Sequence, residues 1–318
     1  MTERENALLA IHHQQPQWLP DNDAFYLVDP PDIERPLHAS GRDMYGVYWS
    51  LPDMPGALTY HDDRLPPVLE DVTEWREKVH FCDLTQLDWQ EAARQADHYD
   101  RENKIILCRN MIGLFERVQM LMRFQDALMS FLTEPEEMYA LLGAIADQKI
   151  RQIQLYAEYI RPDAIKYQDD WGNQLATFIS PQVWRELVKP HTKRIYDAIH
   201  DCGMMVMQHS CGRVEALVPD MVEMGAEMWQ SCQSCNDLAA LKRTWGDRIT
   251  FVGALDDQKV LDMPDVTEEQ IEQEVKEKIQ MLAPGGGFII GPNGTSLAPE
   301  REALVRRLIK KYAGEIYG

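Results

Sequence analysis

The segment MQHSCG (207–212) places an imidazole, His209, and a thiol, Cys211, two residues apart at the end of the apolar run GMMVM. Side chains of an extended chain alternate with a period of two, so both groups fall on the same side. Neutral imidazole and thiolate are ligands that zinc prefers in tetrahedral sites, and a catalytic zinc keeps one position open. The pair therefore predicts a metal site, unless it is a buried strand end in which the cysteine acts as a small hydrophobic residue.

Polar residues also follow the other short apolar runs of the chain, at the points where strands would end. They are Asp169 and Asp170 after AIKYQ, Cys232, Gln233 and Cys235 after EMWQS, Asp256 and Asp257 after ITFVG, and Asn293 after FIIG. In a parallel barrel the active site lies at the carboxyl ends of the strands, so these side chains would converge there. Cys232 or Cys235 would then complete a His-Cys-Cys zinc site with the first pair.

Several of these residues also have a purely structural interpretation. Asp169 and Asp170 could cap the following loop, and Trp171 could pack in the core instead of stacking on a substrate. The single C-x-x-C motif at 232–235 falls short of a structural zinc ribbon, which needs two such pairs. It leaves thiol redox chemistry open, and that chemistry predicts a reversible disulfide between the two cysteines.

The elements that must position these residues alternate between short apolar runs and long amphipathic segments from about residue 86 onward. Strands are predicted at 104–108, 164–168, 204–208, 227–231, 249–253 and 288–291, and helices at 115–132, 135–160, 181–201, 213–224 and 267–282. This alternation implies right-handed parallel crossovers. We therefore predict an α/β fold, a single-domain (β/α)8 TIM barrel, with a doubly wound open sheet as the alternative.

The first part of the chain differs from the rest. Residues 1–85 are predicted to form an irregular region packed on the barrel, and residues 86–318 to form its main part. Pieces such as QPQWLPD and DPPDIERP contain prolines that forbid long helices and favour turns or edge strands. The sequence has no G-x-G-x-x-G and no Walker loop, and the glycines at 285–287 precede a strand, so they give little support for phosphate binding.

Composition narrows the possible partners. The chain has 318 residues, 32 of them basic and 52 acidic, for a formal net charge of -20. Such a surface repels nucleic acid and anionic membranes, and it suits a highly carboxylated substrate only if a local basic pocket is present. The acidic start MTERENALLA does not resemble a signal peptide, and no apolar run approaches the roughly 20 residues that span a bilayer. With its six cysteines interpreted as reduced thiols, we expect a cytoplasmic protein.

The order of several motifs resembles that of the uroporphyrinogen decarboxylase superfamily, over roughly residues 105 to 305. The motifs are FERVQMLMRFQDALMSFLTEPE, YQDDWGNQLATFISPQVWRELVKPHTKRI, QHSCGRVEALVPDMVEMGAE, NDLAALKRTWGDRITFVGALD and GGGFIIGPNGT. The resemblance implies a (β/α)8 barrel. True decarboxylases carry an N-terminal Arg-Gln-Ala-Gly-Arg segment that binds the porphyrinogen carboxylates. The comparable region here, PQWLPDNDAFYLVDPPDIER, has no such arginine pair.

The other branch of the superfamily comprises methyltransferases that work with corrinoid proteins, and the chain resembles this branch more closely. In these enzymes zinc sits on a His-x-Cys pair after a barrel strand and on a cysteine near the last strand. His209 and Cys211 match the pair, but Asn293 stands where the family usually has the second cysteine. The resemblance therefore implies zinc on His209 and Cys211, with Cys232 as the expected third ligand and Asp169 or Glu227 as alternatives.

We therefore expect methyl transfer between a small substrate and the cobalt of a corrinoid (cobalamin) carried by a partner protein. The substrate would be a methyl ether, a methylamine or a thiol, and ether demethylation by an anaerobic O-demethylase system is the narrower expectation. Zinc would act as a Lewis acid on the heteroatom of the substrate. The residues expected in the site are Asp169, Asp170 and His209 for catalysis, and Trp171, Gln233 and Asn293 for substrate binding. The alternative is a barrel that binds or decarboxylates a ligand without metal; a homodimer also fits the resemblance.

Overall fold

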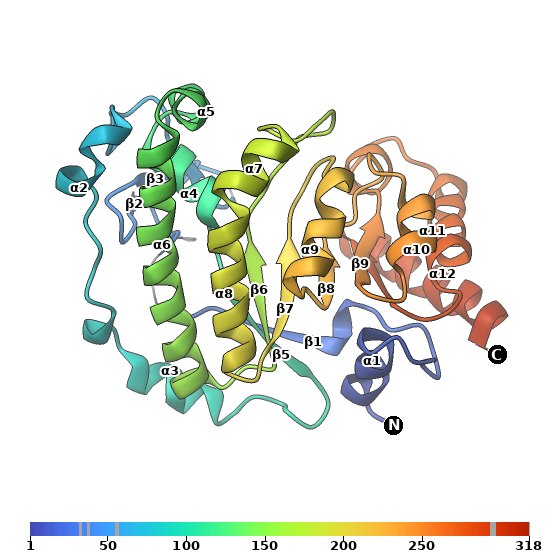
Figure 1. Ribbon diagram of the computed structural model, residues 1–318. Helices are drawn as coiled ribbons and strands as arrows, with labels where there is room; N and C mark the ends of the chain where they lie inside the picture. Colours follow the sequence, from blue (N-terminus) through green and yellow to red (C-terminus); the bar gives the residue numbers. More distant parts are fainter. Residues whose placement is uncertain (32–33, 37–38, 55–56, 293–296, 318) are drawn as a thin grey trace.

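In the computed structural model the chain forms a curled parallel sheet with helices around it (Figure 1). The structure describes residues 1–31, 34–36, 39–54, 57–292 and 297–317. The strands of the sheet, in spatial order, are β1 (Phe25–Val28), β5 (Ile105–Asn110), β6 (Ala164–Gln168), β7 (Met205–His209), β8 (Met228–Gln230), β9 (Thr250–Leu255) and β10 (Phe288–Pro292). All neighbouring strands are parallel, so the fold is the TIM-barrel-like α/β fold that the sequence predicts.

The sheet curls until its two ends meet. A parallel bridge joins Asp21, shortly before β1, to Ile290 in β10, and the Ile290 N–H donates to the Pro20 carbonyl at 2.9 Å. Strand order follows chain order around the ring, so the doubly wound alternative, which requires a reversal of strand order, is wrong. All six predicted strands are present, and β1 is a seventh within the described residues.

Helices cover the outside of the sheet. They are α3 (Trp89–Ala96), α4 (Leu114–Leu121), α5 (Phe124–Thr133), α6 (Pro135–Leu155), α7 (Pro181–Leu187), α8 (Lys189–Asp201), α9 (Val218–Met224), α10 (Leu238–Trp245), α11 (Glu268–Leu282) and α12 (Pro299–Tyr317). Two segments predicted as single helices are divided. Met122 and Arg123 are extended between α4 and α5, and Val188 separates α7 from α8. Pro190 fits the first turn of α8 but would break a continuous helix.

None of the helices that the structure describes combines the length and the apolar composition needed to cross a membrane.

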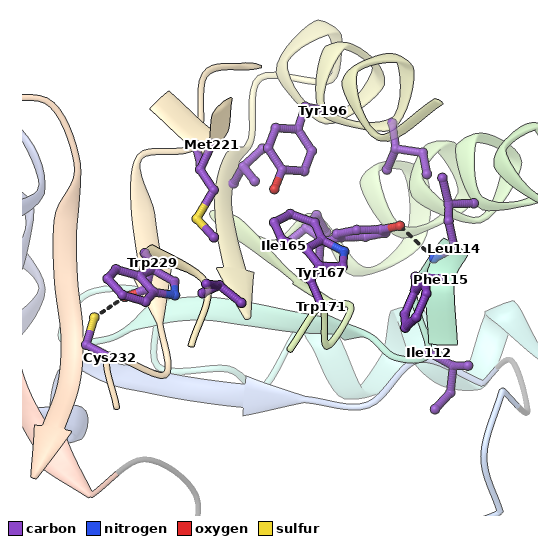
Figure 2. Packing of buried hydrophobic residues seen from close by; sticks show 14 of the residues in the cluster. Ile112, Leu114, Phe115, Ile165, Tyr167, Trp171, Tyr196, Met221, Trp229 and Cys232 are labelled. Carbon is purple, nitrogen blue, oxygen red and sulfur yellow. Dashed lines mark hydrogen bonds between the residues drawn. The ribbon is translucent and has the colours of Figure 1, made fainter. Parts of the chain in front are cut away.

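Side chains of the strands alternate between the inside of the barrel and the layer beneath the helices. In β7, Met207 belongs to the inner hydrophobic cluster, whereas Val206 packs in the outer one. Gln208 points outward as well, because its side-chain oxygen accepts a hydrogen bond from the Tyr196 hydroxyl of α8. Figure 2 shows part of this outer cluster, with Tyr196 between a helix and the sheet. The period of two then turns His209 inward at the carboxyl end of β7.

Helix α1 (Glu3–Ile11) closes the N-terminal end of the barrel and lies below the strands in Figure 1. Its Ala7, Ala10 and Ile11 are buried in the inner cluster together with residues of β5 to β10. The Thr250 hydroxyl, at the start of β9, donates to the Ala10 carbonyl at 3.2 Å. A ligand inside the barrel therefore approaches from the other end, where the strands finish.

The N-terminal region also contains a small antiparallel sheet of β2 (Gly41–Arg42), β3 (Tyr48–Ser50) and β4 (Tyr60–His61), followed by the short α2 (Trp75–Lys78). Two buried ion pairs join this region to the barrel helices. Arg117 of α4 contacts Asp43 at 2.5 Å, and Lys149 of α6 contacts Glu34 at 2.8 Å. The region thus packs on the barrel and supplies its strand β1; the domain boundary at residue 85 stays a prediction.

Candidate functional site

Three potential metal ligands converge at the carboxyl ends of β6 and β7. Asp170, His209 and Cys211 each offer one ligand atom, and these atoms lie within 4.8 Å of one another. The His209 Nε2 atom is 3.6 Å from the Cys211 Sγ atom and 3.5 Å from the Asp170 Oδ1 atom. The donors are an imidazole nitrogen, a thiol and a carboxylate, a set that zinc binds in proteins.

His209 is held in the form that binds metals. Its Nδ1–H donates to the Gln230 side-chain oxygen from β8, which leaves the Nε2 lone pair facing Cys211 and Asp170. Burial, together with the positive charge of Lys166, lowers the pKa of His209 to about 4. The imidazole is therefore neutral near pH 7, and its orientation is fixed before any ion arrives.

Cys211 stays protonated in the absence of a cation. Burial raises the pKa of the thiol well above its usual value, and the nearby carboxylates of Asp170 and Glu116 raise it further. The Cys211 backbone N–H donates to Asp170 Oδ1 at 2.7 Å, which holds the loop against the carboxylate. A divalent cation would remove the thiol proton on binding, since a thiolate is the ligand form of cysteine.

The loop that carries Cys211 depends on a glycine. Gly212 has φ +85°, and a Cβ atom placed on it would lie 2.3 Å from the backbone of Gly172 in the loop after β6. A side chain at this position therefore meets both backbone strain and a rigid obstacle. The close approach keeps the loops after β6 and β7 together, and with them Asp170 and Cys211.

We predict that Gly212→Ala lowers the free energy of unfolding by about 2–3 kcal/mol, because the clash adds to the cost of a left-handed alanine. Gly203→Ala is the matched control, since Gly203 also has a positive φ, +76°, but nothing lies within 4 Å of its added Cβ. Urea denaturation followed by circular dichroism measures both. Equal losses in the two variants would show that the contact with Gly172 contributes nothing.

Asp169 is not part of the group of three donors, although it is adjacent to Asp170 in the chain. Its carboxylate is buried and accepts the backbone N–H groups of Phe115 and Glu116 at the start of α4, and the Trp171 indole N–H at 2.8 Å. Burial raises the pKa of Asp169 to about 6. Gly113 leaves room for this contact, because a Cβ there would lie 2.1 Å from the Asp169 Cβ. Asp169 therefore caps the N-terminus of α4, which matches its structural interpretation more closely than a catalytic role.

Trp171 lies in the outer cluster and not at the mouth of the barrel. Figure 2 shows Trp171 among the buried residues of this cluster. It is 1% exposed, and its ring centre is 4.6 Å from that of Trp184 in α7. Its indole N–H is taken up by Asp169. Of the two interpretations of Trp171, the arrangement matches core packing, and substrate stacking would require the side chain to leave the core.

Cys232, the expected third ligand, does not join the group of three donors. Its side chain is fully buried in the outer hydrophobic cluster, and its Sγ–H donates to the Trp229 carbonyl at 3.1 Å (Figure 2). The alternative Glu227 accepts the Val206 N–H near the start of β7, at the opposite end of the barrel from His209. In this arrangement Asp170 takes the third position that the sequence assigned to Cys232.

A cavity of about 290 Å³ opens beside the three donors. His209, Cys211 and Gln233 line it, and Asp256, Asp257 and Asp262 lie along the same cavity. The Gln233 side-chain oxygen accepts the Gly212 N–H and a Gln174 N–H, each at 2.8 Å. Gln233 thus lies where a substrate residue was expected. Asn293, the other residue expected to bind substrate there, lies outside the described residues.

Two side chains near the site were not anticipated. Glu116, at the third position of α4, is buried, and its Oε2 atom has no hydrogen-bond partner in the described part of the chain. Burial and the charges of Asp170 and Asp169 raise its pKa well above the usual value. Lys166 lies in β6, four residues before Asp170. The sequence offered one signal for each residue. Glu116 is a charged residue within an amphipathic helical pattern, and Lys166 is a charged residue in an otherwise apolar strand.

A parallel barrel with polar side chains gathered where its strands end belongs to the class of TIM-barrel proteins that use this face for binding and catalysis. The family model described as uroporphyrinogen decarboxylase (URO-D) matches residues 54–303. The chain therefore belongs to the uroporphyrinogen decarboxylase family, as its motifs indicated.

One solved structure shares the fold over the whole chain. A methyltransferase from Methanosarcina mazei superposes over 100% of both chains with a TM-score of 0.72 at 15% sequence identity. A glycoside hydrolase family 10 endo-β-1,4-xylanase from Gloeophyllum trabeum has a TM-score of 0.44 at 11% identity, covering 71% of this chain and 82% of its own. No curated protein matches the sequence. At 15% identity the match to the methyltransferase shows the barrel fold alone.

Proposed function

We propose that the chain is a methyltransferase that moves a methyl group between a small substrate and the cobalt of a corrinoid carried by a partner protein. Zinc held by Asp170, His209 and Cys211 would assist the transfer. The observation that carries the proposal is the convergence of these three ligand atoms within 4.8 Å at the mouth of the barrel. Family membership and the fold shared with a protein described as a methyltransferase support it.

The residues fit zinc in both chemistry and orientation. Gln230 fixes the imidazole so that Nε2 faces the other two donors, and three protein ligands leave one position for a substrate atom. Zinc bound there supplies a Lewis acid that stabilises negative charge on the substrate heteroatom. Glu116 is buried near Asp170, and burial raises its pKa well above the usual value, so it is the group that we propose to supply a proton. In ether demethylation the methyl–oxygen bond breaks, the methyl carbon bonds to cobalt(I), and the oxygen takes up a proton.

Decarboxylation of a porphyrinogen is disfavoured by the charges of the site. The cavity beside the donors is lined by Asp256, Asp257 and Asp262, and Arg109 near the mouth already forms an ion pair with Asp29. A substrate with many carboxylates would meet repulsion there. The N-terminal arginine pair that would offset the repulsion is missing from the sequence.

We expect the zinc-loaded protein to methylate free cob(I)alamin with one class of donor among methyl ethers, methylamines and methyl thioethers. The absorption change of the cobalamin on methylation measures the transfer. Cys232→Ser is the matched control, because it removes a thiol that lies outside the group of three donors. Failure of every donor class with zinc bound to the protein would reject the proposed function.

A further inference from the structure

A second cavity lies inside the barrel, next to the site. It has a volume of about 200 Å³ and is lined mainly by apolar side chains, among them Phe25 and Leu27 of β1, Leu107 of β5 and Val252 of β9. Because its lining residues come from strands around the whole ring, we call it the lumen cavity. Pro292, at the end of β10, also borders it.

Lys166 and Gln230 bring polar groups to the lumen cavity. Lys166 points inward from the middle of β6, where it lies in register with Met207 of β7. Gln230 connects the two cavities, because its side chain accepts the hydrogen bond from His209, which lines the first one. A molecule in the lumen cavity would therefore lie directly beside the three proposed metal ligands.

The Lys166 ammonium has no hydrogen bond and no ion pair at contact distance within the described residues. The charge of Asp170 acts on it only from beyond ion-pair distance. The neighbouring Arg109 does have a counter-ion, Asp29, with the guanidinium forming hydrogen bonds to the carboxylate. Burial and the charge of Arg109 lower the pKa of Lys166 to about 8, which still leaves the side chain charged near pH 7. A largely buried charge without a hydrogen-bonded counter-ion is costly unless a ligand supplies one.

We propose that Lys166 binds the carboxylate of the substrate in the lumen cavity, so that the substrate is a small methyl ether or methyl thioether that carries one carboxylate. This inference rests on the proposed function for the position of the methyl group, which would lie toward Asp170, His209 and Cys211. The apolar walls would hold the carbon skeleton between the two ends.

The proposal separates the donor classes that the sequence left open. A methylamine or quaternary ammonium without a carboxylate carries its positive charge on the nitrogen that bears the methyl group and offers no anion to Lys166, so the charge of Lys166 would stay uncompensated. A single carboxylate gains a charge-assisted hydrogen bond in a confined space. A substrate with one carboxylate also avoids the electrostatic repulsion that a substrate with many carboxylates would meet at the acidic first cavity.

Isothermal titration calorimetry of the zinc-loaded protein at pH 7 tests the inference with matched probes. The carboxylates are 4-methoxybenzoate and 3-(methylthio)propanoate, the neutral probe is methoxybenzene, and the cationic probe is 4-methoxybenzylammonium. We expect at least one carboxylate to bind about tenfold or more tightly than the neutral and cationic probes. Lys166→Met should abolish this preference, and Lys166→Arg should retain part of it. Lys310→Met, which removes the same charge from an exposed position on α12, should change nothing.

Two results would overturn the inference: neither carboxylate binds the wild-type protein, or Lys166→Met binds both as tightly as the wild type. A thermal melt separates ligand binding from a structural role, because removal of an unpaired buried charge should leave the melting temperature unchanged or raise it. A fall in melting temperature would point to a structural lysine. The titration needs no methyl transfer, so a Lys166-dependent carboxylate site without cobalamin methylation would reject the proposed function and keep the site.

Discussion

Zinc content is expected to fall from about one ion per chain to nearly none when His209 is replaced by alanine or Cys211 by serine. The structure adds Asp170→Asn to this set, because Asp170 supplies the third ligand atom within 4.8 Å. Methyl transfer should fall with zinc, by roughly a hundredfold or more, since changes even outside the ligand shell of such sites cost up to that factor. Metal analysis of protein purified without chelator measures the content.

Cys232→Ser is the control that decides whether Asp170, as the structure indicates, or Cys232, as the sequence suggested, is the third metal ligand. Cys232 is buried beside Trp229, and a serine could keep the hydrogen bond to the Trp229 carbonyl, so zinc should stay. Loss of zinc in Cys232→Ser, with zinc retained in Asp170→Asn, would restore the cysteine as third ligand. It would also mean that the loop after β8 rearranges when the metal binds.

Lys149→Met is expected to destabilise the protein by about 3–5 kcal/mol, the usual cost of leaving one partner of a buried ion pair without the other. The Lys149 side chain is 0% exposed and that of Glu34 is 4% exposed. The ammonium also donates to the Asn110 side chain and to the Met111 carbonyl at the end of β5. Urea unfolding followed by tryptophan fluorescence would report the loss.

Two further variants test whether the loss of stability in Lys149→Met arises because the ion pair is buried. Lys149→Met combined with Glu34→Met removes both charges and should recover part of the lost stability. Lys193→Met breaks the pair with Asp197 on the surface of α8, where the side chains are 44% and 51% exposed, and should cost much less. A similar loss in the buried and exposed single variants would contradict the argument.

Much of the fold could be predicted because buried parallel strands read as short apolar runs between amphipathic helices. Strand β1 was harder to recognise, since Phe25–Val28 lies among prolines and only its position in the ring makes it a barrel strand. The breaks at Met122 and Val188 were missed because apolar periodicity continues across them. Pro190 was a local signal for the second break, whereas apolar periodicity gave no sign of the first.

The candidate site was predicted where the strand period still applied. His209 and Cys211 lie together as the sequence predicted, although Cys211 comes two residues after the end of β7. Beyond a strand the alternation is not assured, so the sequence could not tell which of Asp169 and Asp170 approaches His209. Asp169 turns to the N–H groups of α4, and Asp170 turns to His209. For the same reason the sequence could not place Cys232 in the outer cluster.

The closure of the barrel by α1 has a kinetic consequence. With Ala7, Ala10 and Ile11 filling the N-terminal end, a small molecule and a corrinoid protein must use the same opening at the ends of the strands. Under the proposed function the small molecule has to arrive before the large partner covers that opening, and its product has to leave after the partner does. Steady-state rates should therefore follow a compulsory order, and an excess of the corrinoid protein should inhibit turnover by trapping the chain without substrate.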